Sequence, residues 1–232
     1  MAVVAIGMAT GYRTREAALL LVAAGPLGML EFGFWDVMQR IDVLGLALFV
    51  LVAGPGAWSA DVELGRAQPT RFVDAARAIW FLRVGAGVAL IVVAFHEKLA
   101  NPDMSVAFLA DHGELNVAAQ LGLGWSDLEF ARVAGAIEVL FGLLLISGAL
   151  PQAIVLIAGI PFNATLYFFG VNELLGHLPV YGAMLVLLVY GSDPELRKAV
   201  MDPWPFGRRG QGEERQPGER DTGDAGPVLA GS

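Results

Sequence analysis

The chain has 232 residues, of which 56% are hydrophobic and only 16% are charged, and it contains no cysteine. Soluble domains carry about a quarter of charged residues, so this composition predicts an integral membrane protein in contact with the lipid bilayer. The lack of cysteine excludes thiolate nucleophiles, disulfide relays and Cys-ligated metal centres within the chain itself. The formal net charge of −8 argues against nucleic acid as a partner.

Six apolar segments are candidates for membrane-spanning helices, each of which needs about 20 apolar residues. In chain order they are 16–31, 42–58, 78–95, 128–150, 151–170 and 179–191. Pro179 is expected to open the last helix, because the residue before a proline disfavours helical dihedral angles. From Pro203 the composition becomes polar and rich in glycine and charge, which predicts a disordered tail.

The segment between the third and fourth candidate spans is expected to contain a short helix. Asn101 is expected to cap this helix, with Pro102 at its first position and Gly113 after its end. Its apolar face predicts a position in the membrane interface. Ser126 and Glu129 then form the pattern of a capping box that opens the next span.

The distribution of Lys and Arg predicts the orientation in the membrane. Eleven of these fifteen residues lie in three groups, at 13–15, 66–77 and 197–220, and the order of the six spans puts all three groups on one side. Positively charged segments stay in the cytoplasm. The C-terminus is therefore expected to be cytoplasmic, and the external loops are expected at 31–42, 98–127 and 170–179.

A comparison of the chain with itself indicates an internal repeat. When segment 30–54 is laid over segment 167–191 without gaps, Asp36 meets Glu173, and identical residues occur at Phe32, Gly33, Gly45 and Gly54. We call this the self-alignment. Repeats are common in membrane folds. The sequence therefore predicts four regions, namely a partial N-terminal repeat (1–58), a cytoplasmic linker (59–76), a complete four-helix unit (77–191) and a disordered cytoplasmic tail (192–232).

The self-alignment, when extended to the start of the chain, places Met1 opposite Glu138, in the middle of a candidate span. A helix that begins at membrane depth leaves up to four N–H groups unpaired. The expectation is that a longer reading frame lies upstream and encodes one further helix and the missing half of this one. An in-frame stop codon immediately before Met1 would contradict it.

Polar residues are predicted to gather at the external end of the four-helix unit. A carboxylate at the depth of Glu138 costs a few kcal/mol unless it is neutral or paired. One interpretation is an outward-facing polar pocket for a quinone headgroup, a metal ion or a small anion. The other is a buried ion network that ties the helices together. The candidate residues are Glu97, Lys98, Arg132, Glu138, Asn163, Glu173 and His177.

A metal site is a weaker alternative, with His96, Glu173 and His177 as its candidate ligands. Glu173 and His177 are four residues apart, but a helix that starts at Pro179 would leave both in a loop. Arg83 lies about 21 Å from Glu97 along the same predicted helix, so it is not part of this cluster. Its side chain is expected to extend to the cytoplasmic headgroups.

Three motifs carry a resemblance to a known family. They are EKLANP (97–102), RVAGAIEVLFGLLL (132–145) and ELLGHLPVYG (173–182), and with WFLRVGAG (80–87) they occur in this order within 77–191. This half of the chain resembles the DoxX family of bacterial membrane proteins. The resemblance implies a four-helix transmembrane bundle in the bacterial plasma membrane and an association with membrane redox systems.

The first hypothesis is therefore a non-catalytic or weakly catalytic membrane subunit of a redox system. Its external pocket would bind quinone or a small sulfur species, and a soluble thiol or sulfur redox enzyme would supply the cysteines. Glu97 and Glu138 would handle protons, while Lys98 and Arg132 would hold an anionic or carbonyl oxygen. A transporter, a structural or assembly factor, and a homo-oligomer are alternatives that the sequence leaves open.

Overall fold

The structure is a computed structural model, which describes residues 2–67 and 72–206. All of the regular elements within these residues are helical, so the prediction of an all-α protein is confirmed there. The long helices are α2 (Thr14–Phe32), α4 (Ile41–Ala53), α6 (Phe72–Ala94), α9 (Asp127–Ser147), α10 (Pro151–Phe169) and α11 (Val171–Ser192). The short helices are α1 (Ala2–Thr10), α3 (Phe34–Met38), α5 (Ala60–Glu63), the π-helix η1 (Phe95–Leu99), α7 (Pro102–Asp111), the 3-10 helix η2 (Gly113–Leu115), α8 (Val117–Gln120) and α12 (Arg197–Met201).

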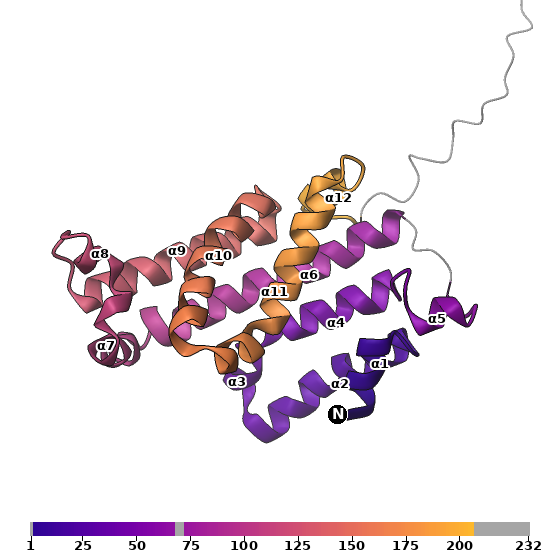
Figure 1. Cartoon of the computed structure of the whole chain (residues 1–232), viewed down its shortest axis with the longest axis horizontal. Coiled ribbons are helices and arrows are strands. Elements are labelled where there is room, and N and C mark those ends of the chain that lie inside the picture. Colours follow the sequence, from indigo (N-terminus) through magenta and orange to yellow (C-terminus); the bar gives the residue numbers. More distant parts are fainter. Residues whose placement is uncertain (1, 68–71, 207–232) are drawn as a thin grey trace, which may run out of the picture.

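Helices α2, α4, α6 and α9 lie side by side in this order, and α10 and α11 cross one face of this layer (Figure 1). Glycine allows the closest approaches. A Cβ atom on Gly45 of α4 would lie 2.8 Å from the Cα of Gly85 in α6, and one on Gly142 of α9 would lie 2.5 Å from the carbonyl oxygen of Gly87. Small residues at such crossings let two helix backbones touch, which gives close van der Waals packing.

Two of the described helical segments are long and apolar enough to cross a membrane. They are Asp74–Leu99, with a mean hydropathy of 2.2, and Asp127–Ser147, with a mean hydropathy of 1.9. Ile41–Ala53, Pro151–Ala164 and Gly176–Ser192 are shorter apolar stretches. Large apolar side chains that are more than half exposed occur along four long helices, at Leu19, Leu20, Leu27, Leu30 and Phe32 of α2, Leu140 and Leu143 of α9, Leu156 and Ile160 of α10, and Leu185 and Val189 of α11.

The predicted start of the last helix at Pro179 is wrong, because α11 begins at Val171 and contains Pro179 within it. Pro161 likewise lies inside the continuous helix α10. A proline removes one helical hydrogen bond, and neighbouring packing in an apolar bundle can outweigh that loss. Here α10 and α11 pack against each other, and each continues through its proline.

The prediction of a disordered tail from residue 192 is wrong for its first part. Arg197–Met201 forms α12, which packs against α6 and α11. The indole N–H of Trp80 donates to the carbonyl of Pro203 at 2.9 Å, and the Trp80 ring packs edge-on against Trp204 and Phe206. The aromatic residues just before the charged stretch therefore anchor the chain to the start of α6. Residues 207–232 of the predicted tail lie outside the described residues.

The expected extension of the Arg83 side chain to the cytoplasmic headgroups is wrong, because this side chain is fully buried. Its guanidinium donates to the backbone carbonyls of Val200, Asp202 and Ile146, of which the Asp202 bond is 2.7 Å long. A buried cation needs such acceptors, since leaving it without partners costs several kcal/mol. Arg83 therefore fastens α12 and the end of α9 to α6.

The self-alignment also relates helix boundaries in the structure. Helix α2 covers 14–32 and α10 covers 151–169, so their first and last positions coincide when the two segments are aligned. Arg13 and Leu150, which precede them, are the non-glycine residues with positive φ in the described chain, at 48° and 49°. The same left-handed conformation recurs at Gly11 and Gly148, just after α1 and α9. The duplication stays a prediction, and these shared backbone features favour it.

The segment between η1 and α9 agrees with the prediction in part. Asn101 precedes α7, but its side chain donates to the carbonyl of His96 at 2.8 Å and does not cap the helix. The helix ends at Asp111, and Gly113 starts η2. The capping box is confirmed, because the Ser126 hydroxyl accepts from the Glu129 N–H and the Glu129 carboxylate accepts from the Ser126 N–H.

Asp61 of α5 connects the predicted linker to the start of α2. Its carboxylate accepts hydrogen bonds from the N–H groups of Arg13 and Thr14 and from the Thr14 hydroxyl, at 2.8 to 2.9 Å. The Thr14 N–H bond is the main reason that the pKa of Asp61 lies below its ordinary value of 3.8. A carboxylate at a helix N-terminus also interacts favourably with the unpaired N–H groups there.

We expect this contact to make stability depend on pH in the acidic range. A lowered pKa in the folded state means that Asp61 stabilises the protein fully above the ordinary pKa, and that this stabilisation is lost as the pH falls through the lowered value. Thermal unfolding in detergent should therefore separate wild type from Asp61→Asn at neutral pH, with the difference shrinking below the ordinary value of 3.8. Glu63→Gln, at an exposed position of α5, is the control. A difference in unfolding temperature between wild type and Asp61→Asn that stays constant into strong acid would contradict this role.

Candidate functional site

The predicted polar cluster divides into two places in the structure. Lys98 of η1 and Glu138 of α9 form an ion pair, with the Lys98 ammonium nitrogen 2.7 Å and 2.8 Å from the two carboxylate oxygens. Their side chains are 22% and 31% exposed. The pair forms where the π-helical turn widens the end of α6, and π-turns occur frequently at functional sites.

Arg132 and Glu97 of the predicted ion network, and the pocket candidate Asn163, do not join this pair. Arg132 is exposed on α9. Glu97 is half-buried, and its backbone carbonyl accepts from the Ser105 hydroxyl at 2.9 Å. Asn163 is exposed, and its amide donates to the carbonyl of Gly159 in its own helix at 2.7 Å. The predicted network is thus reduced to one pair that fastens η1 to α9.

The metal alternative gains no support. Among the described residues no group of three or more His, Asp or Glu side chains is placed to hold a metal ion. His96 lies in η1, while His177 lies in α11 and lines a different site. The backbone of Glu173 belongs to α11, but its side chain lies outside what the structure describes.

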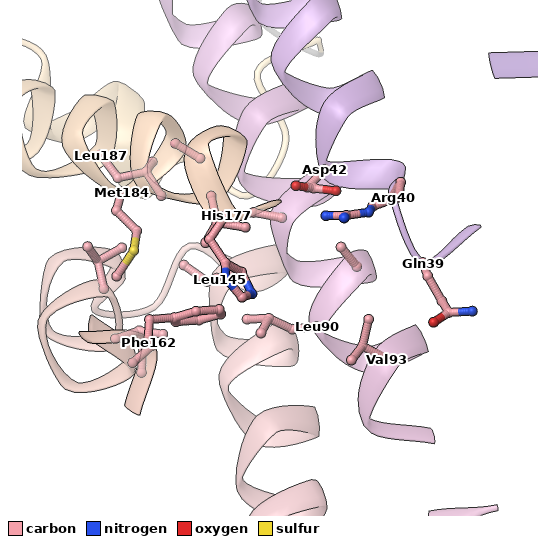
Figure 2. A pocket seen from close by; sticks show the side chains of 17 residues that line it. Gln39, Arg40, Asp42, Leu90, Val93, Leu145, Phe162, His177, Met184 and Leu187 are labelled. Atoms are coloured by element: carbon pink, nitrogen blue, oxygen red, sulfur yellow. The ribbon is translucent and has the colours of Figure 1, made fainter. Parts of the chain in front are cut away.

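His177 lines a pocket of about 140 Å³ that is enclosed mainly by α6, α10 and α11, with the start of α4 at one side (Figure 2). All but four of its lining residues are apolar. Leu90 and Val93 come from α6, Phe162 from α10 and Met184 from α11. The ring of Phe162 packs edge-on against the imidazole of His177, with ring centroids 5.1 Å apart. Walls of this kind suit the apolar part of a small ligand.

The four polar lining residues are Gln39, Arg40, Asp42 and His177. Arg40 precedes α4, and its guanidinium donates to the carbonyl of Gly176 at 3.0 Å, which connects the start of α4 to α11. Asp42 is 6% exposed, and neither of its carboxylate oxygens has a hydrogen-bond partner. Figure 2 shows Asp42 and Arg40 at the start of α4, and the His177 ring of α11 beside the Phe162 ring. A few convergent polar groups in an apolar pocket are typical of a ligand site.

Sequence reasoning predicted His177 but missed Gln39, Arg40 and Asp42. Asp42 is the first residue of the candidate span 42–58, and a single acid at the end of a span does not by itself indicate a site. A usable signal was present in the repeat, because the self-alignment places Arg40 opposite His177. Both of these residues line the pocket, one from each related segment.

No protein-family model matches this chain, and no curated protein or solved structure is significantly similar to it. The chemistry of the site therefore rests on its own residues. The arrangement can hold an apolar body against Phe162 and Met184, and Arg40, Asp42 or His177 can form hydrogen bonds with a polar headgroup.

Proposed function

We propose that this chain is a multi-pass protein of a bacterial plasma membrane, of the DoxX type, that acts as a subunit of a membrane redox system. Its pocket would bind the headgroup of a quinone or a small sulfur species. The observation that carries the proposal is the apolar pocket with Arg40, Asp42 and His177 at its polar end. A quinone has the matching form, with carbonyl oxygens on a ring that is otherwise apolar.

The exposed apolar side chains of α2, α9, α10 and α11 support the membrane assignment. Monomeric soluble proteins rarely expose contiguous apolar patches larger than a few hundred Å². Lipid would cover these faces. The segments predicted to be cytoplasmic and external also lie at opposite ends of the helices. Helices α5 and α12 lie toward one end of α6, whereas α7 and α8 lie toward its other end (Figure 1).

The topology has a direct test. A tag inserted at Gly113 is expected to be reachable from outside intact cells, because the segment from 98 to 127 is predicted to be external. A tag at Gly210 is expected to be reachable only after the cells are opened. Labelling of both tags from one side would contradict the proposed six-span topology.

The ligand proposal is tested by quinone binding to the purified full chain in detergent. We expect quinone to be extracted from the protein, and a short-chain benzoquinone to bind in a titration. Ala158→Phe should abolish binding, because Ala158 lines the pocket and is buried. Ala136→Phe, at an exposed position of α9, is the matched control. Binding that survives Ala158→Phe in a folded protein would place the ligand elsewhere.

A transporter is the second candidate function, and one observation favours it. The pocket lies between α4 and α11, whose residues the self-alignment relates, and transporters often bind substrate between internal repeats. Because the chain contains no cysteine, Ala158→Cys introduces a single thiol at the pocket. Labelling of this thiol by impermeant reagents from both sides of the membrane would favour transport. Labelling from one side only would favour a fixed binding site.

A further inference from the structure

Asp42 lies at the pocket without a partner. Its side chain is buried, and both carboxylate oxygens lack hydrogen bonds. The charged or titratable groups that line the pocket with it are Arg40 from the turn before α4 and His177 from α11. Helices α6, α9 and α10 contribute only apolar side chains to the pocket, among them Ala89, Leu145 and Ile154. The N–H groups of the first turn of α4 add a partial positive charge.

An ionised carboxylate in this position is poorly compensated. Removing it from water without hydrogen bonds costs several kcal/mol, and distant charges recover only part of that cost. The guanidinium at the pocket, that of Arg40, donates to the carbonyl of Gly176 at 3.0 Å. A protonated carboxyl avoids most of the cost, because it carries no charge and needs one acceptor for its O–H group.

We propose that Asp42 is a neutral carboxylic acid that donates a hydrogen bond to the oxygen of an uncharged carbonyl ligand. Among the described residues neither carboxylate oxygen of Asp42 has a hydrogen-bond partner, so a ligand oxygen would complete the site. An acid held neutral by an apolar site is an effective hydrogen-bond donor. This inference rests on the proposed function, because the ligand is bound in the same pocket. It adds that binding requires a proton on Asp42.

The positive charge of Arg40 near Asp42 disfavours a cationic ligand in this pocket. The apolar walls favour a ligand whose body is a ring or a short chain. The ligand class is therefore an uncharged amphiphile with a carbonyl headgroup. An amine that pairs with ionised Asp42 is the rival, and the experiment distinguishes the two.

The protonation of Asp42 is tested by infrared spectroscopy of the ligand-free full chain. A protonated carboxyl gives a C=O band at higher frequency than any carboxylate. We expect this band in wild type and in Asp36→Asn, which removes an exposed acid of α3, and we expect Asp42→Asn to lack it. If Asp42→Asn leaves the high-frequency region unchanged, Asp42 is ionised and the inference is overturned, whatever the quinone titration shows.

The link to binding is tested with a short-chain benzoquinone at a series of pH values. Wild-type affinity should fall roughly tenfold per pH unit once Asp42 ionises. Asp42→Asn should bind with little pH dependence, because its amide donates at every pH, and Asp42→Leu should bind roughly tenfold more weakly than Asp42→Asn at low pH. If the infrared band is present but no benzoquinone binds, the quinone function fails while the neutral acid stands. Tighter binding of an alkylamine that needs ionised Asp42 would overturn the inference.

Discussion

Gly45→Ala is expected to destabilise the protein by about 2 kcal/mol or more, whereas Gly182→Ala is expected to be neutral or slightly stabilising. The two glycines occupy corresponding positions in the self-alignment, one in α4 and the other in α11. A methyl group on Gly45 would lie 2.8 Å from the Cα of Gly85 and 2.9 Å from the carbonyl oxygen of Phe81, which are backbone atoms that cannot rotate away. A methyl group on Gly182 meets nothing within 4 Å.

This pair is a sensitive comparison because the chemical change is the same in both variants and both glycines lie inside a helix. In a helix interior alanine is favoured over glycine by roughly 1 kcal/mol, so intrinsic propensity alone would make both variants more stable. Only the contact between α4 and α6 can reverse the sign at Gly45. Thermal unfolding in detergent measures the difference, and equal melting temperatures for the two variants would show that α4 and α6 are not in backbone contact.

Glu138→Lys is expected to destabilise the protein on the order of 3 kcal/mol, because it places two ammonium groups together in a partly buried site. Glu138→Gln should cost less, since the amide remains able to accept a hydrogen bond from Lys98. In the native protein the ammonium nitrogen of Lys98 lies within 2.8 Å of both carboxylate oxygens of Glu138. Unfolding of the detergent-solubilised variants gives both values.

Exchanging the two charges distinguishes the effect of the ion pair from the effect of a charge at position 138. The double variant Lys98→Glu with Glu138→Lys restores opposite charges and is expected to recover a large part of the stability lost in Glu138→Lys. Arg132→Gln is the control, because Arg132 is exposed on the same helix and lies outside the pair. If Glu138→Gln and Glu138→Lys unfold at the same temperature, the pair contributes nothing, and its role as the fastening of η1 to α9 is wrong.

The amino-acid sequence alone was enough to place most of the helices and their order. Local signals suffice for these features, because apolar runs of a given length and the Ser126 capping box depend on residues close together in the chain. The self-alignment was also visible in the sequence, and it relates the ends of α2 and α10 in the structure. Lys98 and Glu138 were predicted as candidate site residues, because charged residues in apolar segments are easy to recognise in the sequence.

Which of the polar residues meet depended on how the helices pack. Arg83 was expected at headgroups and instead binds the carbonyls of Val200 and Asp202, which are distant from it in the chain. Asp42 stands at the end of a candidate span, where its charge alone does not indicate a site, because its role depends on α6, α10 and α11 closing around it. Burial and hydrogen bonding are properties of the packed helices, and a residue-by-residue pattern contains neither. The same reason explains Gly45 and Gly182, which are alike in sequence and differ only in whether a second backbone lies against them.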